Sequence, residues 1–186
     1  MKIMLLCLVF LIFLGGCSAA PGELQQGLDL RSKLLNANAF TFDADITADY
    51  GDKLHQFSMA CCADGKGNLD FEVTRPQTIA GITGRISEGT GALTFEDVAL
   101  HFDLLTDDQL SPVSAPWILV KTLRSGYLTS ACREKAGIRL TADDSYGDEA
   151  LTLDIWLNED DLPHRAEILY GGRRILTLLI KNAVLS

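Results

Sequence analysis

The segment AFTFDADITADY, residues 39–50, alternates apolar and polar side chains along its whole length. Phe, Ala, Ile or Tyr occupies every even position from 40 to 50, and Thr or Asp occupies every odd position from 41 to 49. Side chains on a β-strand point alternately to the two faces of the sheet, so this period of two predicts a long strand with one buried and one hydrated face. The segment therefore indicates an antiparallel sheet that is covered on one side.

The period of two continues on both sides of a central helical segment. Turn signals such as Gly51-Asp52-Lys53 and Asp64-Gly65-Lys66-Gly67-Asn68 separate short strands up to residue 102, and a second run of strands extends from 127 to 184. We count about eleven predicted strands, and short connections favour pairing between sequential neighbours. The predicted fold class is α+β and mainly β, with a strongly curved antiparallel sheet that forms an open half-barrel.

Two helices are predicted beside the strands. Residues 23–38 carry leucines at helical spacing, and residues 114–126 have Ser114 as a potential N-cap, Pro116 in the first turn and Gly126 as a stop. The segment between the strands and this second helix, residues 106–112, is predicted to be a polar loop. A sheet with one apolar face needs a cover, so we expect both helices on the concave face.

The N-terminal stretch MKIMLLCLVFLIFLGGC, residues 1–17, has the features of an export signal. Lys2 precedes an apolar run of 12 residues, which is shorter than the roughly 20 residues of a membrane-spanning helix. Leu14-Gly15-Gly16-Cys17 resembles the lipobox of bacterial lipoproteins. The resemblance implies a signal peptide at 1–16, lipidation of Cys17 with acyl chains such as palmitate, a tether at 17–22 and a single domain at 23–186. The alternative is an ordinary secretory signal with an incidental cysteine.

Charge and lipidation limit the location and the partners. Without the signal, the chain has 15 basic and 25 acidic residues, which gives a net charge of −10. A nucleic-acid-binding protein needs the opposite sign, so no nucleic-acid partner is expected. Two acyl chains anchor a protein stably to a bilayer, whereas a single chain gives only marginal membrane binding. We expect a protein anchored on the extracytoplasmic side of the cell membrane, or of the outer membrane in a host with two membranes.

Three cysteines, Cys61, Cys62 and Cys132, remain beside the lipobox cysteine. Adjacent residues of a strand face opposite sides, so only one of Cys61 and Cys62 can share a face with a given partner. The sequence leaves two alternatives open. Either Cys61 or Cys62 forms a disulfide with Cys132, or all three cysteines are free thiols. The spacing contains no zinc-binding CxxC pair.

No arrangement typical of an enzyme is found in the sequence. His55, His101 and His164 lie on separate strand-like segments without an HExxH or GxSxG motif. The acidic series from Asp43 to Asp52 lacks the glycine and the closing glutamate of an EF-hand loop, although acidic turns at 143–149 and 159–161 leave a weak surface calcium site open. We therefore predict no catalytic residue, no metal and no cofactor.

The order of elements resembles the LolA/LolB superfamily. The residues that carry this resemblance are the strand beginning Phe40-Thr41-Phe42, the break at Arg75-Pro76, the helical segment 111–126 and the closing hairpin 163–184. The resemblance implies an incomplete barrel around an apolar cavity that accepts acyl chains or lipoprotein. The layout also resembles that of GerS lipoproteins of spore-forming clostridia, which implies a role through a protein partner.

Two functions follow as hypotheses. The first is an anchored lipoprotein that binds a lipid or acyl chain in the half-barrel, and its alternative is that the same side chains form a filled core. The second is a non-enzymatic envelope scaffold that acts through a partner protein or as a homodimer. The predicted cavity residues of the first are Phe42, Ile46, Phe71, Phe95, Phe102, Trp117, Val120 and Leu153.

Overall fold

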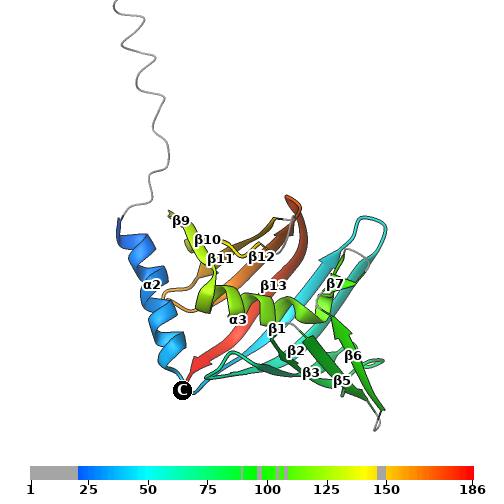
Figure 1. The fold of residues 1–186 in the computed structure, drawn as a ribbon. Coiled ribbons are helices and arrows are strands. Elements are labelled where there is room, and N and C mark those ends of the chain that lie inside the picture. The colour runs from blue at the N-terminus through cyan, green and yellow to red at the C-terminus, as the bar shows by residue number, and fades with distance from the viewer. Residues whose placement is uncertain (1–20, 89, 96–97, 104, 107–108, 146–149) are drawn as a thin grey trace, which may run out of the picture.

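The computed structural model describes residues 21–186, except for 89, 96–97, 104, 107–108 and 146–149. The predicted signal peptide, Cys17 and most of the tether lie outside the described residues. Within the described part, eleven antiparallel strands form one curved, unclosed sheet, and two α-helices accompany it (Figure 1). The predicted fold class is confirmed.

The sheet joins two meanders of hairpin-connected strands. Its order is β6-β5-β4-β3-β2-β1-β13-β12-β11-β10-β9. The pairing of β1 with β13, from Phe40 opposite Leu185 to Ala48 opposite Leu176, is the contact that unites the two halves. The strands are β1 (Ala39–Asp49), β2 (Leu54–Asp64), β3 (Leu69–Arg75), β4 (Thr83–Ser87), β5 (Thr90–Phe95), β6 (Val98–Asp103), β9 (Tyr127–Glu134), β10 (Gly137–Asp143), β11 (Leu151–Leu157), β12 (Pro163–Tyr170) and β13 (Arg173–Leu185).

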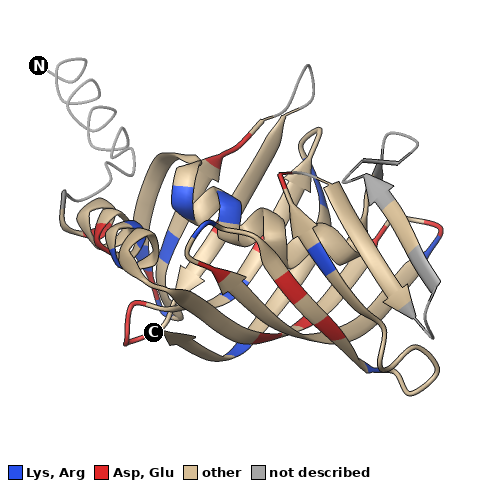
Figure 2. Cartoon of the chain, turned by 60° about the horizontal axis from the view of Figure 1, so that its bottom comes forward, with Lys and Arg blue, Asp and Glu red and all other residues tan. Residues whose placement is uncertain are grey.

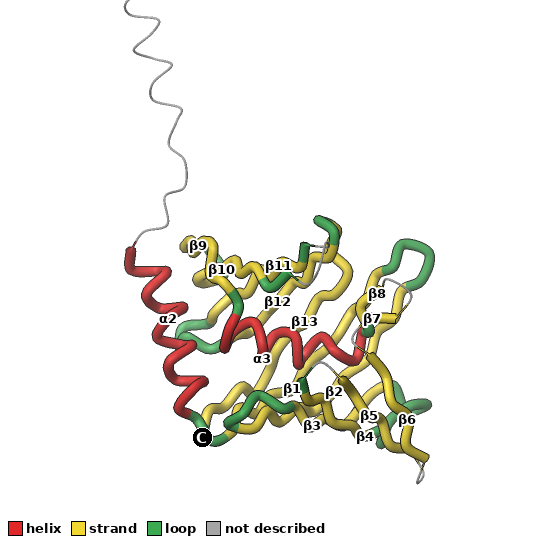
Figure 3. The backbone as a smooth tube through the Cα atoms, in the orientation of Figure 1, coloured by secondary structure: helices red, strands yellow, loops and turns green. Residues whose placement is uncertain are grey.

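The helix α3 (Ala115–Ser125) crosses the concave face of the sheet (Figure 3). Eight of its 11 residues are buried, so it is enclosed on nearly every side. A short 3₁₀ helix, η2 (Pro112–Ser114), leads into it. Ser114 occupies the N-cap position of α3, as predicted, but its side chain makes no capping hydrogen bond, because the Ser114 hydroxyl donates to the carbonyl of Ser111 at 2.6 Å inside that 3₁₀ turn.

The helix α2 (Pro21–Asn36) packs against β9, β10 and α3. Gly27 allows a close approach to the sheet, because a Cβ atom at this position would lie 2.9 Å from Leu140 Cδ2. Leu30 and Leu34 of α2 are buried in the same core as α3. Both helices therefore cover the concave side.

A small two-stranded hairpin occupies the segment that the sequence predicts to be a polar loop. Its strands are β7 (Leu105–Thr106) and β8 (Gln109–Leu110), paired with Leu105 opposite Leu110. Leu110 is 4% exposed. Burial of Leu110 against the core holds this segment in place. The polar residues around Leu110 do not predict that burial.

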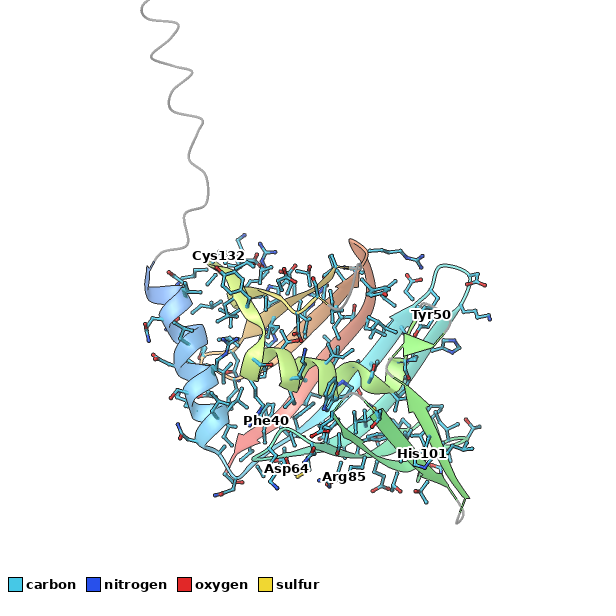
Figure 4. The ribbon with its side chains drawn as sticks, viewed as in Figure 1. Phe40, Tyr50, Asp64, Arg85, His101 and Cys132 are labelled. Carbon is cyan, nitrogen blue, oxygen red and sulfur yellow. The ribbon has the colours of Figure 1, made fainter. Side chains whose placement is uncertain are left out.

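The two faces of the sheet differ as the alternation predicts. In β1 the even positions from Phe40 to Ala48 are buried. The outer face carries charged pairs, among them Arg85 with Asp64 and Asp70 on β2, β3 and β4. Figure 2 shows acidic and basic residues distributed along the strands, and Figure 4 places Asp64 and Arg85 near each other at the lower edge.

Candidate functional site

Six of the eight predicted cavity residues are buried in one continuous apolar core. Trp117 is 6% exposed and is the most exposed of the six, so α3 and the inner face of the sheet lie directly against each other. Phe95 and Phe102 belong to β5 and β6, but their side chains lie outside the described set. The six are Phe42, Ile46, Phe71, Trp117, Val120 and Leu153. Whether any of them contacts a ligand stays a prediction.

An apolar pocket of about 530 Å³ lies at one end of the half-barrel, beside the filled core. It is formed by the start of β2, the segment after β3, β5 and η2, and we call it the inner pocket. Its rim carries Leu54 and Ile79, which are 62% and 37% exposed. Its lining residues are Leu54, His55, Gln56, Phe57, Val73, Pro76, Thr78, Ile79, Ile82, Leu93, Pro112 and Val113.

The inner pocket exists because β3 ends earlier than its neighbour β2. Pro76 has no backbone N–H to offer to a strand partner, and the β2–β3 pairing ends at Ser58 opposite Arg75. Residues 76–82 then fold back onto β3, where the Gly81 N–H donates to the Val73 carbonyl at 2.9 Å. Gly81 has φ = +87°, which glycine adopts without strain. The next strand, β4, therefore begins only at Thr83.

The roof of the inner pocket is tied to the β1–β2 hairpin. The Tyr50 hydroxyl donates to the Leu110 carbonyl at 2.5 Å, two residues before η2. The Tyr50 and His55 rings meet edge to face with their centroids 6.1 Å apart, and Figure 4 shows Tyr50 at this end of the sheet. Burial raises the pKa of Tyr50, so its hydroxyl stays protonated and remains a hydrogen-bond donor at neutral pH.

A second, more polar hollow of about 650 Å³ lies on the outer face, and we call it the outer pocket. Asp45, one of its lining residues, accepts hydrogen bonds from two other lining residues, Arg75 at 2.7 Å and Ser58 at 2.6 Å, and from Lys181 of β13 at 2.7 Å. The hydrogen bond from Lys181 is the largest cause that lowers the pKa of Asp45, so this carboxylate is ionised at neutral pH. The lining residues are Asp45, Ile46, Thr47, Gln56, Phe57, Ser58, Arg75, Pro76, Gln77 and Leu179.

The C-terminal ends of the two helices are held by arginines from the opposite helix. Arg31 of α2 donates to the carbonyls of Leu123 and Gly126 at the end of α3, at 2.8 and 2.5 Å. In return, Arg124 of α3 donates to the carbonyl of Leu34 near the end of α2 at 2.9 Å. Each guanidinium satisfies carbonyls that have no partner within their own helix. We call this pair of contacts the arginine exchange.

A further contact fixes α3 to the second half of the sheet. Asp144, just after β10, accepts hydrogen bonds from Lys121 at 2.6 Å and from the Thr122 hydroxyl at 2.8 Å. The predicted acidic turn at 143–149 thus uses one of its carboxylates to hold the helix, and its residues 146–149 lie outside the described part. Among the described residues, no three His, Cys, Asp or Glu side chains come together as a metal-binding group.

The three cysteines of the fold are free thiols in the structure. Cys61 is buried on the inner face and Cys62 is exposed on the outer face, which confirms that the two neighbours point to opposite sides. Burial raises the pKa of the Cys61 thiol and keeps it protonated. Cys132 lies on β9 at one edge of the sheet, with five strands between it and β2, so the topology separates it from both.

Of the predicted cavity residues with described side chains, Ile46 lines the outer pocket, and sequence reasoning missed the other lining residues of the two pockets. It selected large apolar residues of the inner face, and the six whose side chains are described are buried in the core. The signals that point to the pockets are the proline break at Arg75-Pro76 and an exposed leucine, Leu54, directly after the hairpin turn. None of the helices in the described residues is long and apolar enough to cross a bilayer.

Comparison with known proteins found no matching family model and no matching curated protein. Solved structures do match over most of their length. They include an uncharacterized conserved protein from Thermus thermophilus, with 12% identity and a TM-score of 0.49 over 88% of this chain and 87% of that one.

Two further matches are to proteins with descriptive names. A LolA superfamily protein from Nitrosomonas europaea has 9% identity and a TM-score of 0.45 over 86% of this chain and 93% of that one. The lipoprotein LppX from Mycobacterium tuberculosis has 14% identity and a TM-score of 0.44 over 87% and 93%. This chain is similar to a LolA superfamily protein. The likeness to GerS stays a prediction.

Proposed function

We propose that the protein is a membrane-anchored extracytoplasmic lipoprotein that binds one apolar ligand, a lipid or an acyl chain, in the inner pocket. The observation that carries this proposal is the pocket itself, an apolar hollow of about 530 Å³ with exposed Leu54 and Ile79 at its rim. A volume of this size is in the range of a single small-molecule site. Apolar side chains exposed around a hollow typically mark a binding surface.

The filled core favours this location over the centre of the half-barrel. The buried helix α3 occupies the space that an open half-barrel would offer to a ligand. Binding in the centre would require α3 to leave the core, which would expose its eight buried residues to water. The inner pocket needs no such movement, because it is open beside η2.

The anchor at Cys17 is part of the same proposal. The helix α2 begins at Pro21, four positions after Cys17. Four extended residues span at most about 14 Å, so the fold would stay close to the bilayer surface. Mass spectrometry of the mature protein tests this anchor: the expected first residue is a cysteine that carries a diacylglycerol thioether, and an unmodified N-terminal peptide would contradict it.

The ligand is tested with the full chain after removal of bound lipid. We expect the protein, incubated with a total lipid extract and washed, to retain an alkyl-chain molecule that native mass spectrometry detects at a ratio near one per chain. If it retains none, and pull-down from the native envelope recovers a stoichiometric partner instead, the scaffold hypothesis replaces this proposal. No catalytic step is part of the proposed function.

Val113→Trp is the variant that tests the position of the ligand. Val113 lines the inner pocket from η2, and an indole at this position would fill much of the hollow. We expect the affinity for the neutral fluorescent probe N-phenyl-1-naphthylamine to fall about tenfold or more, which corresponds to about 1.4 kcal/mol.

The matched control is Val184→Trp. Val184 is 54% exposed and pairs with Thr41, at the opposite end of β1 from the inner pocket. Its substitution adds the same side chain without entering the pocket and is expected to leave probe binding unchanged. Equal loss in both variants, or no loss in either, would show that the probe does not bind beside η2.

A further inference from the structure

The wall of the half-barrel has a gap where the inner and outer pockets meet. Residues 54–57 of β2 pair with β1 on one side, but in the described part of the chain β3 pairs with β2 only from Ser58 onward. Gln56, Phe57 and Pro76 line both pockets. The apolar hollow inside the sheet and the polar hollow outside it therefore adjoin across the missing strand pairing.

The chemistry of the two hollows is different. The inner pocket is lined mainly by aliphatic and aromatic side chains such as Val73, Ile82 and Leu93. The outer pocket contains Arg75 and the amides of Gln56 and Gln77. An amphiphile placed through the gap would have its chain among apolar side chains and its head group among hydrogen-bond donors.

Two cations bound to Asp45 have donors to spare for an anion: Arg75, which lines the outer pocket, and Lys181, which reaches Asp45 from β13 beside it. The guanidinium of Arg75 and the ammonium of Lys181 are both bound to the single carboxylate of Asp45, and their side chains are 68% and 59% exposed. The bond from Arg75 to Asp45 uses one Nη atom of a guanidinium that has five N–H donors. An exposed guanidinium beside an ammonium is the arrangement that binds carboxylate and phosphate oxygens.

We propose that the gap between β2 and the end of β3 is a binding site for a single-chain anionic amphiphile, with the alkyl chain in the inner pocket and a carboxylate or phosphate head group at Arg75 and Lys181 on the outer face. This inference rests on the proposed function and adds the class of the ligand. The volume of the inner pocket is in the range of a site for one small molecule, which is the reason for proposing a single chain.

The test compares three probes that share one myristoyl chain and differ in the head group. They are myristate with a carboxylate, lysophosphatidylglycerol with a phosphodiester, and monomyristoylglycerol with no charge. We expect both anionic probes to bind more tightly than the neutral one, and added salt to weaken the anionic probes alone. The relative affinity of myristate and lysophosphatidylglycerol distinguishes a fatty acid from a phospholipid product as the ligand.

Arg75→Gln and Lys181→Gln remove the two cations one at a time. Each variant is expected to lower the affinity for the anionic probes about fivefold and to leave monomyristoylglycerol binding unchanged. Arg85→Gln is the matched control, because Arg85 is an exposed outer-face arginine that pairs with Asp64 and Asp70 away from the gap. Arg85→Gln should change neither the affinity for the anionic probes nor the affinity for monomyristoylglycerol.

The outcomes separate this inference from the proposed function. If the neutral and anionic probes bind equally in the wild type, or if Arg75→Gln and Lys181→Gln weaken all three probes alike, the head-group site is wrong while apolar binding stands. If none of the three probes binds to the wild type, the proposed function itself fails. Either result can be read from the same titrations.

Discussion

Trp117→Ala is expected to lower the free energy of unfolding by about 3–5 kcal/mol, as the loss of a fully packed tryptophan does in other cores. The Trp117 side chain projects from α3 into the continuous core and is 6% exposed. Truncation would remove its contacts and leave a cavity between the helix and the sheet. Urea unfolding followed by circular dichroism measures the change.

Trp156→Ala is the control for this prediction, since the chain has two tryptophans. Trp156 lies on the outer face of β11, under the guanidinium of Arg165 at 4.9 Å, and its indole N–H donates to Glu134. Its loss is expected to cost about 1 kcal/mol. If the half-barrel held an open central cavity around Trp117, both truncations would have similar small costs, and the filled core described above would be wrong.

Arg31→Met is expected to lower the free energy of unfolding by about 2–3 kcal/mol, because it removes one half of the arginine exchange. Methionine keeps much of the apolar stem but leaves the carbonyls of Leu123 and Gly126 without the charged donor that they have in the wild type. Hydrogen–deuterium exchange should then increase most in the last turn of α3. Chemical denaturation and exchange of peptides that cover 120–126 measure the two effects.

Lys33→Met is the control on the same helix. Lys33 lies in the last turn of α2 and is exposed, so its loss removes a charge without breaking a contact between the helices. Its effect on stability is expected to stay within about 0.5 kcal/mol. A similar cost for Arg31→Met and Lys33→Met, with unchanged exchange in α3, would show that the arginine exchange contributes little to the docking of the helices.

Much of the architecture is predictable from local patterns. The alternation from Phe40 to Tyr50 places each side chain on the correct face of β1, because a strand positions neighbouring side chains on opposite sides whatever it pairs with. Glycine and asparagine in the turns at 51–53 and 64–68 locate the hairpins for an equally local reason. Both helices are predicted within a few residues of their observed bounds, since their periodicity and stops are encoded in consecutive residues.

Contacts between distant segments are not encoded in this local way. The pairing of β1 with β13 joins residues that are more than a hundred positions apart, and Arg31 reaches carbonyls 92 and 95 residues away. The hydrophobic periodicity does not specify which strands pair with each other, because any two strands with one apolar face satisfy the same pattern. The arginine exchange cannot be predicted from the sequence, because Arg31 and Arg124 there resemble any other arginine of a helix.

The sequence establishes which side of the sheet is apolar and predicts an export signal ahead of the fold, because both depend on residue type and spacing. Tertiary packing decides whether the hollow behind that apolar side is empty. Here α3 enters it with eight buried residues, so large side chains such as Phe42 and Trp117 belong to one packed core. The open space of the inner pocket lies at the end of the half-barrel, where Pro76 follows the end of a strand and η2, which begins at Pro112, comes to face it.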